Sequence, residues 1–86
     1  MDKVEAARIL FEVLAVYQAK SCQELVELID VTLHFEKVGM DGRQYQVEVS
    51  VFWDDRDRTT LRVIGAIDDG GWRAFFPLSR DFLKEV

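Results

Sequence analysis

The first long segment, residues 4–19, contains no Gly or Pro, and its polar side chains recur with helical spacing at Glu5, Arg8 and Glu12. Most of the other positions are apolar, so the pattern predicts a helix with a narrow polar stripe. The apolar arc is wider than that of an ordinary surface helix. We therefore expect this helix to have two packing partners: the sheet, and either a second helical segment or another copy of the chain.

A second, short helix is predicted over roughly residues 22–29. Ser21 and Glu24 match the capping box, in which each side chain accepts a hydrogen bond from the other residue's backbone N–H. The residues that follow supply an apolar face. Two other arrangements fit the same stretch: one kinked helix that continues to about residue 29, or a strand that begins near Leu28.

From Val31 the helical spacing gives way to alternation, which predicts a strand with one buried face. A three-residue loop, Met40 to Gly42 with Gly at the left-handed position, leads into a second alternating strand over residues 44–54. This loop fixes the register of the two strands. The predicted pairs are Gly39 with Arg43, Phe35 with Val47 and Leu33 with Val49, and the inward side chains of the second strand are Tyr45, Val47, Val49, Val51 and Trp53.

Residues 60–78 form two β-rich runs on either side of Asp69 and Gly70. Asp-Gly between strand formers is a strong signal for a two-residue hairpin turn with positive φ at both central positions. We predict that the two runs are the third and fourth strands of the sheet. The pairs that this turn predicts are Ile67 with Trp72, Gly65 with Ala74, Val63 with Phe76 and Leu61 with Leu78.

Pairing Val51 with Val63 and Val49 with Gly65 joins the two hairpins into an antiparallel meander that keeps the apolar faces together. Pro77 cannot donate to a strand ladder, so the fourth strand should end there or lie at an edge. After it, Ser79 is expected to cap a final turn over residues 80–86.

The predicted fold is therefore α+β, with two layers: an N-terminal helix and a short second helix on a four-stranded antiparallel β-meander. In element order this arrangement resembles the cystatin-like arrangement of a helix on a curved sheet and, more loosely, double-stranded-RNA-binding domains. The resemblance covers the order of elements and no motif. It implies a fold, and no functional residue is carried over from it.

Length and charge narrow the function. The chain has 86 residues, which we expect to form one domain, and a formal net charge of -5. An anionic surface repels phosphate backbones, so we expect no nucleic-acid partner. Charged residues interrupt the one apolar stretch, whereas a membrane span needs about 20 apolar residues, and the start lacks the pattern of a secretory signal. We expect a cytoplasmic protein with no membrane partner.

Candidate chemistry is sparse, and the sequence predicts no catalytic, cofactor-binding or metal-binding residue. Asp68 and Asp69 are explained by turn chemistry, and the loop 54–59 lacks the spacing of a calcium-binding loop. His34 falls on the outward face with no partner beside it in the sequence. Cys22 is the only cysteine, which excludes an internal disulfide and favours a passive, small apolar role.

A shallow dent in the inner face is predicted where Gly65 lies in the row of Leu33, Val49 and Ala74. Small residues permit close approach, so the favoured interpretation is that the N-terminal helix packs into the dent. The alternative is an apolar pocket for a small molecule, used by a binding protein or a minor enzyme. The residues of this predicted pocket are Gly65, Ala74, Trp72, Phe76 and Leu33.

The outer face carries the second candidate site. The predicted register places Ile64 opposite Phe75, with Ala66 adjacent and Phe52 at diagonal reach. Contiguous exposed apolar surface usually marks a partner, although Phe82 and Leu83 could instead fold back over it. The function that we predict is a small acidic protein-interaction module that binds a protein partner or forms a homodimer, with small-molecule binding as the alternative.

Overall fold

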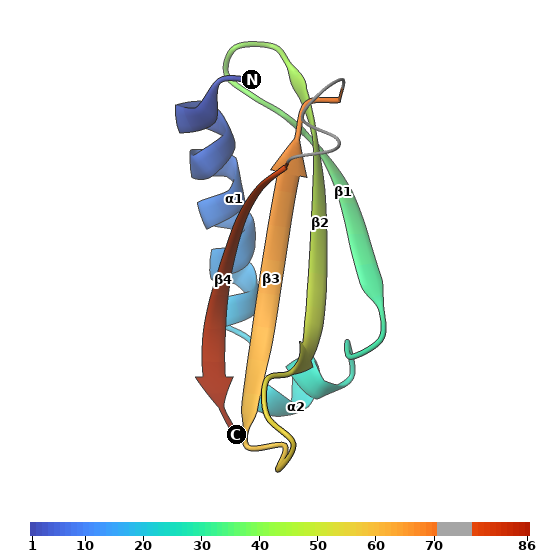
Figure 1. Ribbon diagram of the computed structural model, residues 1–86. Coiled ribbons are helices and arrows are strands. Elements are labelled where there is room, and N and C mark those ends of the chain that lie inside the picture. Colours follow the sequence, from blue (N-terminus) through green and yellow to red (C-terminus); the bar gives the residue numbers. More distant parts are fainter. Residues whose placement is uncertain (71–76) are drawn as a thin grey trace.

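The computed structural model describes residues 1–70 and 77–86. A helix and a short second helix are followed by a four-stranded antiparallel sheet, in the α+β arrangement that the sequence predicts (Figure 1). The elements are α1 (Lys3–Gln18), α2 (Cys22–Val26), β1 (Thr32–Val38), β2 (Gln44–Trp53), β3 (Thr60–Asp68) and β4 (Leu78–Glu85).

Asp2 caps the N-terminus of helix α1, where its Oδ1 accepts hydrogen bonds from the backbone N–H groups of Val4 and Glu5, each at 3.1 Å. This satisfies two of the N–H groups that have no partner within the helix. The buried side chains of α1 follow the helical period that the sequence shows. They are Ala6, Ile9, Leu10, Val13, Leu14 and Tyr17.

Helix α2 is separate from α1 and carries the predicted capping box of Ser21 and Glu24. It ends at Val26, earlier than the predicted boundary. Beyond it, Asp30 adopts a φ of 67°, and Ile29 forms an isolated parallel bridge with Val51. The chain therefore leaves the helix early in order to reach the sheet.

The strands run in the order β1-β2-β3-β4. The predicted registers of the first two pairs are confirmed: Leu33 lies opposite Val49, and Val49 lies opposite Gly65. The turn between β1 and β2 is also as predicted, because Gly42 has a φ of 80° and the Gly39 N–H donates to the Arg43 carbonyl at 2.8 Å.

The prediction for the last strand was wrong. Strand β4 covers Leu78–Glu85, where the sequence analysis placed a terminal turn. Its register is displaced along the chain from the predicted one. Ile67 pairs with Leu78 instead of Trp72, Gly65 with Arg80 instead of Ala74, Val63 with Phe82 instead of Phe76, Leu61 with Lys84 instead of Leu78, and Ile64 with Asp81 instead of Phe75.

Two physical reasons account for this error. Gly70 has the expected positive φ, 86°. The predicted turn also needs a positive φ at Asp69, but among residues 1–70 and 77–86 the non-glycine residues with positive φ are Asp30 and Arg58. Asp69 therefore does not form the first central position of the predicted turn. The observed register also leaves Pro77 just outside the ladder, where its missing N–H costs nothing.

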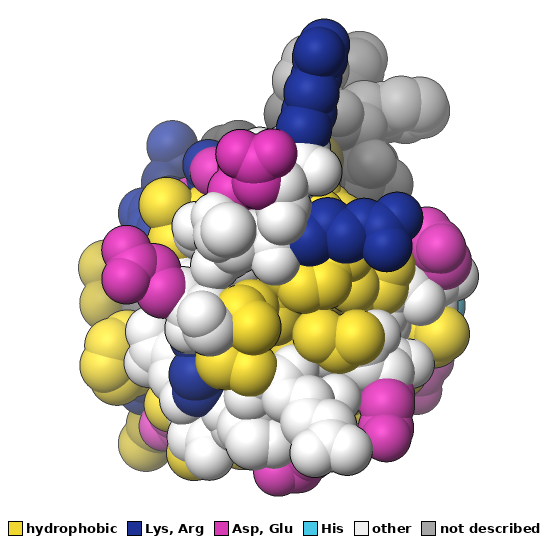
Figure 2. Space-filling model, turned by 90° about the horizontal axis from the view of Figure 1, so that it is seen from below, with side chains coloured by type: hydrophobic (Ala, Val, Ile, Leu, Met, Phe, Trp, Pro, Cys, Tyr) yellow, Lys and Arg dark blue, Asp and Glu magenta, His cyan; other side chains and the backbone are white. Residues whose placement is uncertain are grey.

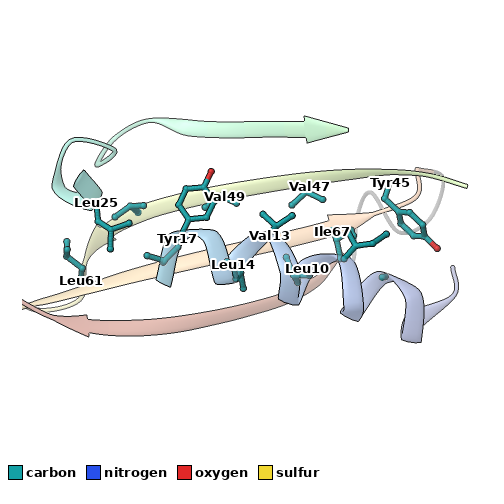
Figure 3. Packing of buried hydrophobic residues seen from close by; sticks show 14 residues of the cluster. Leu10, Val13, Leu14, Tyr17, Leu25, Tyr45, Val47, Val49, Leu61 and Ile67 are labelled. Atoms are coloured by element: carbon teal, nitrogen blue, oxygen red, sulfur yellow. The ribbon is translucent and has the colours of Figure 1, made fainter. Parts of the chain in front are cut away.

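The core lies between α1 and the inner face of the sheet, and α1 lies over β3 and β4 (Figure 3). Lys84, on the inner face of β4, donates to the carbonyl oxygens of Gln18 (3.2 Å) and Lys20 at the end of α1. Cys22 Sγ donates to the Glu85 carbonyl at 3.3 Å. The helix layer is thus tied to the β4 side, while β1 lies at the opposite edge.

Candidate interaction surface

A groove of about 680 Å³ runs between α1 and β1. It exists because α1 is displaced toward β4. A helix is about 10–12 Å across, whereas four strands spaced at about 4.8 Å extend further, so one helix leaves an edge strand uncovered. The groove is lined by Arg8, Ile9, Glu12, Val13, Val16, Tyr17, Lys20, Phe35, Lys37 and Val38.

The wall of the groove that α1 forms consists of two buried apolar side chains and one exposed apolar side chain. Ile9 and Val13 are buried against the sheet, whereas Val16 is 58% exposed. An exposed valine beside an open groove is poorly explained by packing within the chain. It gives this wall a contact for a further side chain.

Charged side chains form the rim on the α1 side. The Arg8 guanidinium binds Glu5 and also Glu12, at 2.8 Å from Glu12 Oε1. The hydrogen bond from Arg8 and then the Met40 N–H, 3.0 Å away, lower the pKa of Glu5 to about 2, and the same contacts with Glu5 raise the pKa of Arg8. The hydrogen bond from the Met40 N–H to Glu5 joins the N-terminal end of α1 to the turn between β1 and β2.

The lower end of the groove lies near the end of α1, where Tyr17 is buried and Lys20 crosses its ring at 5.9 Å from the centroid. Burial raises the pKa of the Tyr17 phenol. The Lys20 ammonium also lies 3.7 Å from Glu24. This end is therefore held in place by contacts within the chain.

Strand β1 forms the other wall and presents two kinds of free group. Its inward side chains Leu33 and Phe35 are half-buried, while Lys37 and Val38 are exposed. Its second edge pairs with no strand in the described part of the chain. Within that part Lys37 also has no acidic partner at ion-pair distance. We call the groove together with the free edge of Thr32–Val38 the β1 surface.

The polar groups of the free edge follow from the ladder. Because the Gly39 N–H donates to Arg43, the odd-numbered residues of β1 direct their N–H and C=O groups toward β2. The even-numbered residues, including His34 and Glu36, therefore direct theirs away from the sheet. An unpaired row of this kind is a template for another strand.

The outer-face interface predicted from the sequence loses its centre. Ile64 lies between Ser50 and Asp81, and the predicted partner Phe75 is outside the described residues. Ile64 and Ala66 are half-buried, and Phe52 is 38% exposed. The apolar side chains of this face thus alternate with polar ones.

Arg62 reinforces this polar character. Its guanidinium binds Asp54 at 2.7 Å and also contacts Asp81. These two ion pairs together cross the outer face from the β2–β3 loop to β4. Leu83 lies opposite Arg62 on the same face. The remainder of that predicted interface stays a prediction.

The dent predicted at Gly65 is filled by α1. A Cβ at this position would lie 2.8 Å from Leu10 Cδ1 and 3.0 Å from Leu14 Cδ2. Leu33 of the predicted pocket is half-buried nearby. The other predicted pocket residues, Trp72, Ala74 and Phe76, are outside the described residues.

The acidic turns use their carboxylates within the chain. Asp55 accepts from the Thr59 N–H at 3.0 Å, and Asp41 accepts from the Arg43 N–H at 3.0 Å. Asp68 accepts from the Gly70 N–H at 2.9 Å. Among residues 1–70 and 77–86 no group of three or more His, Cys, Asp or Glu side chains is placed to hold a metal ion.

His34 is exposed on the outer face of β1, opposite Glu48, as the alternation predicts. Cys22 is half-buried, and its thiol contacts the Glu85 carbonyl. In the described part of the chain, neither side chain lies beside a second group with which it could act as a nucleophile and its general base.

Two further surfaces carry exposed apolar side chains. A hollow of about 320 Å³ separates α1 from β4 and includes Phe11, which is 73% exposed. Figure 2 shows the end of the molecule that carries α2 and the C-terminus, where hydrophobic side chains gather in the middle with charged side chains around them. Exposed side chains of the elements at this end include Val26 and Val86.

The groove was not predicted from the sequence. The signal was available in the count of elements, since one long helix cannot cover four strands, and the short second helix is at the end of the sheet. The sequence did not show which edge strand the helix leaves uncovered, because the fourth strand, which contacts α1, was predicted at the wrong residues.

No helix of the described residues is long and apolar enough to cross a membrane. Comparison of the chain with protein-family models, with curated proteins and with solved structures finds no match.

Proposed function

We propose that this chain is a protein-interaction module and that the β1 surface is where it binds. The observation that carries the proposal is the off-centre position of α1, which leaves the inner face and the free edge of β1 uncovered. Such a surface offers a partner both apolar contacts and unpaired backbone groups, which are the two components of strand addition.

The composition of the groove agrees with this role. Exposed or half-buried apolar side chains, Val16, Phe35 and Val38, are bordered by Arg8 and Lys37. Protein interfaces commonly combine an apolar centre with a polar rim. The β1 surface has this layout, whereas the apolar residues of the outer face alternate with Ser50, Asp81 and Glu48.

The alternative of small-molecule binding loses its support at Gly65, since Leu10 and Leu14 occupy the space above it. The net charge of -5 still argues against nucleic acid as the partner. We therefore propose a single function.

The proposal can be tested with a photo-crosslinking benzoylphenylalanine at position 35, activated in cells that produce the chain. We expect protein adducts whose yield falls strongly when Val16→Glu is added, because the charge faces the groove. Phe11→Glu is the matched control, because Phe11 is also exposed on α1 but lies on the β4 side.

Both variants should melt at nearly the parent temperature, since exposed substitutions change stability by about 0.5 kcal/mol or less. The absence of adducts, or an equal loss with Phe11→Glu and Val16→Glu, would refute the β1 surface as the binding site.

A further inference from the structure

Strand β1 is close to self-complementary when it is read against a reversed copy of itself. In an antiparallel pair centred on Phe35, every residue from Thr32 to Val38 has a partner. Odd-numbered residues meet odd-numbered ones, so the inner faces of both copies stay on one side. This register also brings the outward-directed N–H and C=O groups of His34 opposite those of the partner's Glu36.

Charge distinguishes this register from its neighbours. Centred on Phe35, the pair places each His34 opposite the partner's Glu36, so that an imidazole meets a carboxylate at two positions of the dimer. Moved by one step toward the end of the strand, it places Glu36 opposite the partner's Glu36. Moved the other way, it places His34 opposite the partner's His34 and leaves Val38 unpaired.

The other edge strand does not share this property. Centred on Asp81, an antiparallel pair of β4 strands sets that carboxylate against its own copy, and centred on Phe82 it sets Arg80 against the partner's Lys84. The thiol of Cys22 also occupies the Glu85 carbonyl near one end of β4. Like charges directly opposite each other are destabilising in a sheet.

We propose that the partner of the β1 surface is a second copy of this chain, joined by antiparallel pairing of the two β1 strands about Phe35. This inference rests on the proposed function and names the occupant of its site. The four-stranded sheets of the two copies become one continuous sheet of eight strands. Both α1 helices lie on the same face, and the two grooves join into one trough with a Phe35 from each copy at its centre.

The interaction is symmetric, since each copy contributes the same strand, and it closes as a dimer without leaving a β1 edge for further addition. It also covers the unpaired backbone row of β1, which would otherwise be a site of uncontrolled strand pairing. The remaining edge, β4, carries the like charges that oppose its own pairing.

A disulfide test reads the register directly. Phe35 faces β2 with its hydrogen-bonding groups, so the two copies of residue 35 form a non-hydrogen-bonded pair with Cα atoms about 4.5 Å apart, within the range of a disulfide. In a background with Cys22→Ala, we expect Phe35→Cys to give a covalent dimer with oxidised glutathione, which accepts the two electrons lost by the thiols.

Lys37→Cys is the matched control on the same face. Residue 37 and its copy are displaced by about four residues, or roughly 13 Å, which no disulfide spans. Leu33→Cys combined with Lys37→Cys should again crosslink, because the register places residue 33 opposite the partner's residue 37. Equal rates for Phe35→Cys and Lys37→Cys, or no crosslinking by either, would overturn the proposed register.

A charge exchange provides a second, non-covalent test by analytical ultracentrifugation. His34→Glu alone places two carboxylates opposite each other at both pairs and should weaken dimerisation by about tenfold. Adding Glu36→His to it restores a histidine opposite a glutamate at both pairs and should recover most of the lost affinity. A parent chain that sediments as a monomer at about 1 mM, or a double variant no better than the single one, would overturn the dimer.

The outcomes separate the dimer from the function on which it rests. If position 35 forms adducts with a different protein in cells while Phe35→Cys stays monomeric, the β1 surface binds another partner and the self-association is wrong. If no adduct forms with any protein, the proposed function itself is wrong. Adducts with a second copy, together with the disulfide, support both.

Discussion

The two edges of this sheet are built from similar strands but finished differently. At the β4 edge, the Lys84 ammonium binds the last carbonyls of α1, and Cys22 contacts the Glu85 carbonyl. At the β1 edge no helix in the described part of the chain crosses the strand, and a groove of about 680 Å³ separates it from α1. The difference shows that the position of one helix decides which side of the inner face is covered.

Core burial is greatest in the central strands. The inner residues of β3, Leu61, Val63 and Ile67, are all 0% exposed, whereas Leu33 and Phe35 of β1, like Leu78 and Phe82 of β4, are half-buried. We therefore expect most of the free energy of unfolding to come from the α1–β3 contact. The β1 surface should contribute little to the stability of one copy and much to association.

The largest expected effect is at the contact between α1 and β3. Leu10→Ala removes a side chain that is 0% exposed and should lower the free energy of unfolding by about 2–5 kcal/mol. Val16→Ala, on the same helix but 58% exposed, should change it by about 0.5 kcal/mol or less. Chemical denaturation at a protein concentration low enough to keep the chain monomeric measures both values. Similar costs would mean that α1 is not packed as described.

A smaller loss is expected at Gly65. A valine there adds atoms where a Cβ alone would already lie 2.8 Å from Leu10 Cδ1, so Gly65→Val should cost about 1–3 kcal/mol through overpacking. Ala66→Val, the next residue on the outer face, is the control and should be nearly neutral. Thermal melts of the two variants compare the faces of one strand. A stable Gly65→Val variant would show that α1 does not approach the sheet this closely.

The smallest effect concerns Tyr45, a buried residue near the start of β2 that lies opposite Lys37 of β1. Burial, followed by the hydrogen bond to Asp41 at 3.0 Å, raises the pKa of Tyr45 to about 12. The neutral phenol is therefore favoured in the folded state. Its contribution is complete below the unfolded pKa of about 10 and is lost as the pH rises toward 12.

The melting temperature should accordingly fall more steeply between pH 10 and 11 for the parent than for Tyr45→Phe, which keeps Tyr17 as an internal reference. Identical slopes for the two proteins would show that Tyr45 is accessible to solvent in the folded chain. That result would extend the open region up to the turn between β1 and β2.

Much of this fold was predictable because local signals agreed with one another. The capping box of Ser21 and Glu24, the Gly42 turn and the alternation of β2 each fix an element without knowledge of the rest. The register of β1 on β2 follows from the loop length, and that of β2 on β3 from the matching of apolar faces. Each of these predictions is confirmed.

The last strand was not predictable by the same means, because two segments competed for one position. The run before Pro77 is more apolar and follows a favourable turn signal, whereas β4 alternates Phe82 with charged residues. What favours β4 is long-range: Lys84 reaches the end of α1, which lies 64 residues away in the chain at Lys20. A contact of that kind leaves no mark on local sequence pattern.

The predicted outer-face interface was argued from the same register. The outer-face interface depended on placing Phe75 opposite Ile64, and the observed neighbour is Asp81. The residues that form the β1 surface had all been assigned to elements correctly, but their exposure depends on where α1 lies across the sheet. In the structure α1 lies over β3 and β4.

The central claim is that β1 has a free edge which a second copy covers. Backbone hydrogen exchange of His34 and Glu36 tests it most directly, because their N–H groups point away from β2 while those of Leu33 and Phe35 point toward it. At low protein concentration His34 and Glu36 should exchange quickly and their odd-numbered neighbours slowly. At concentrations where the dimer forms, all four should be protected. Fast exchange of His34 and Glu36 at every concentration, or protection that appears at the β4 edge instead, would contradict the account.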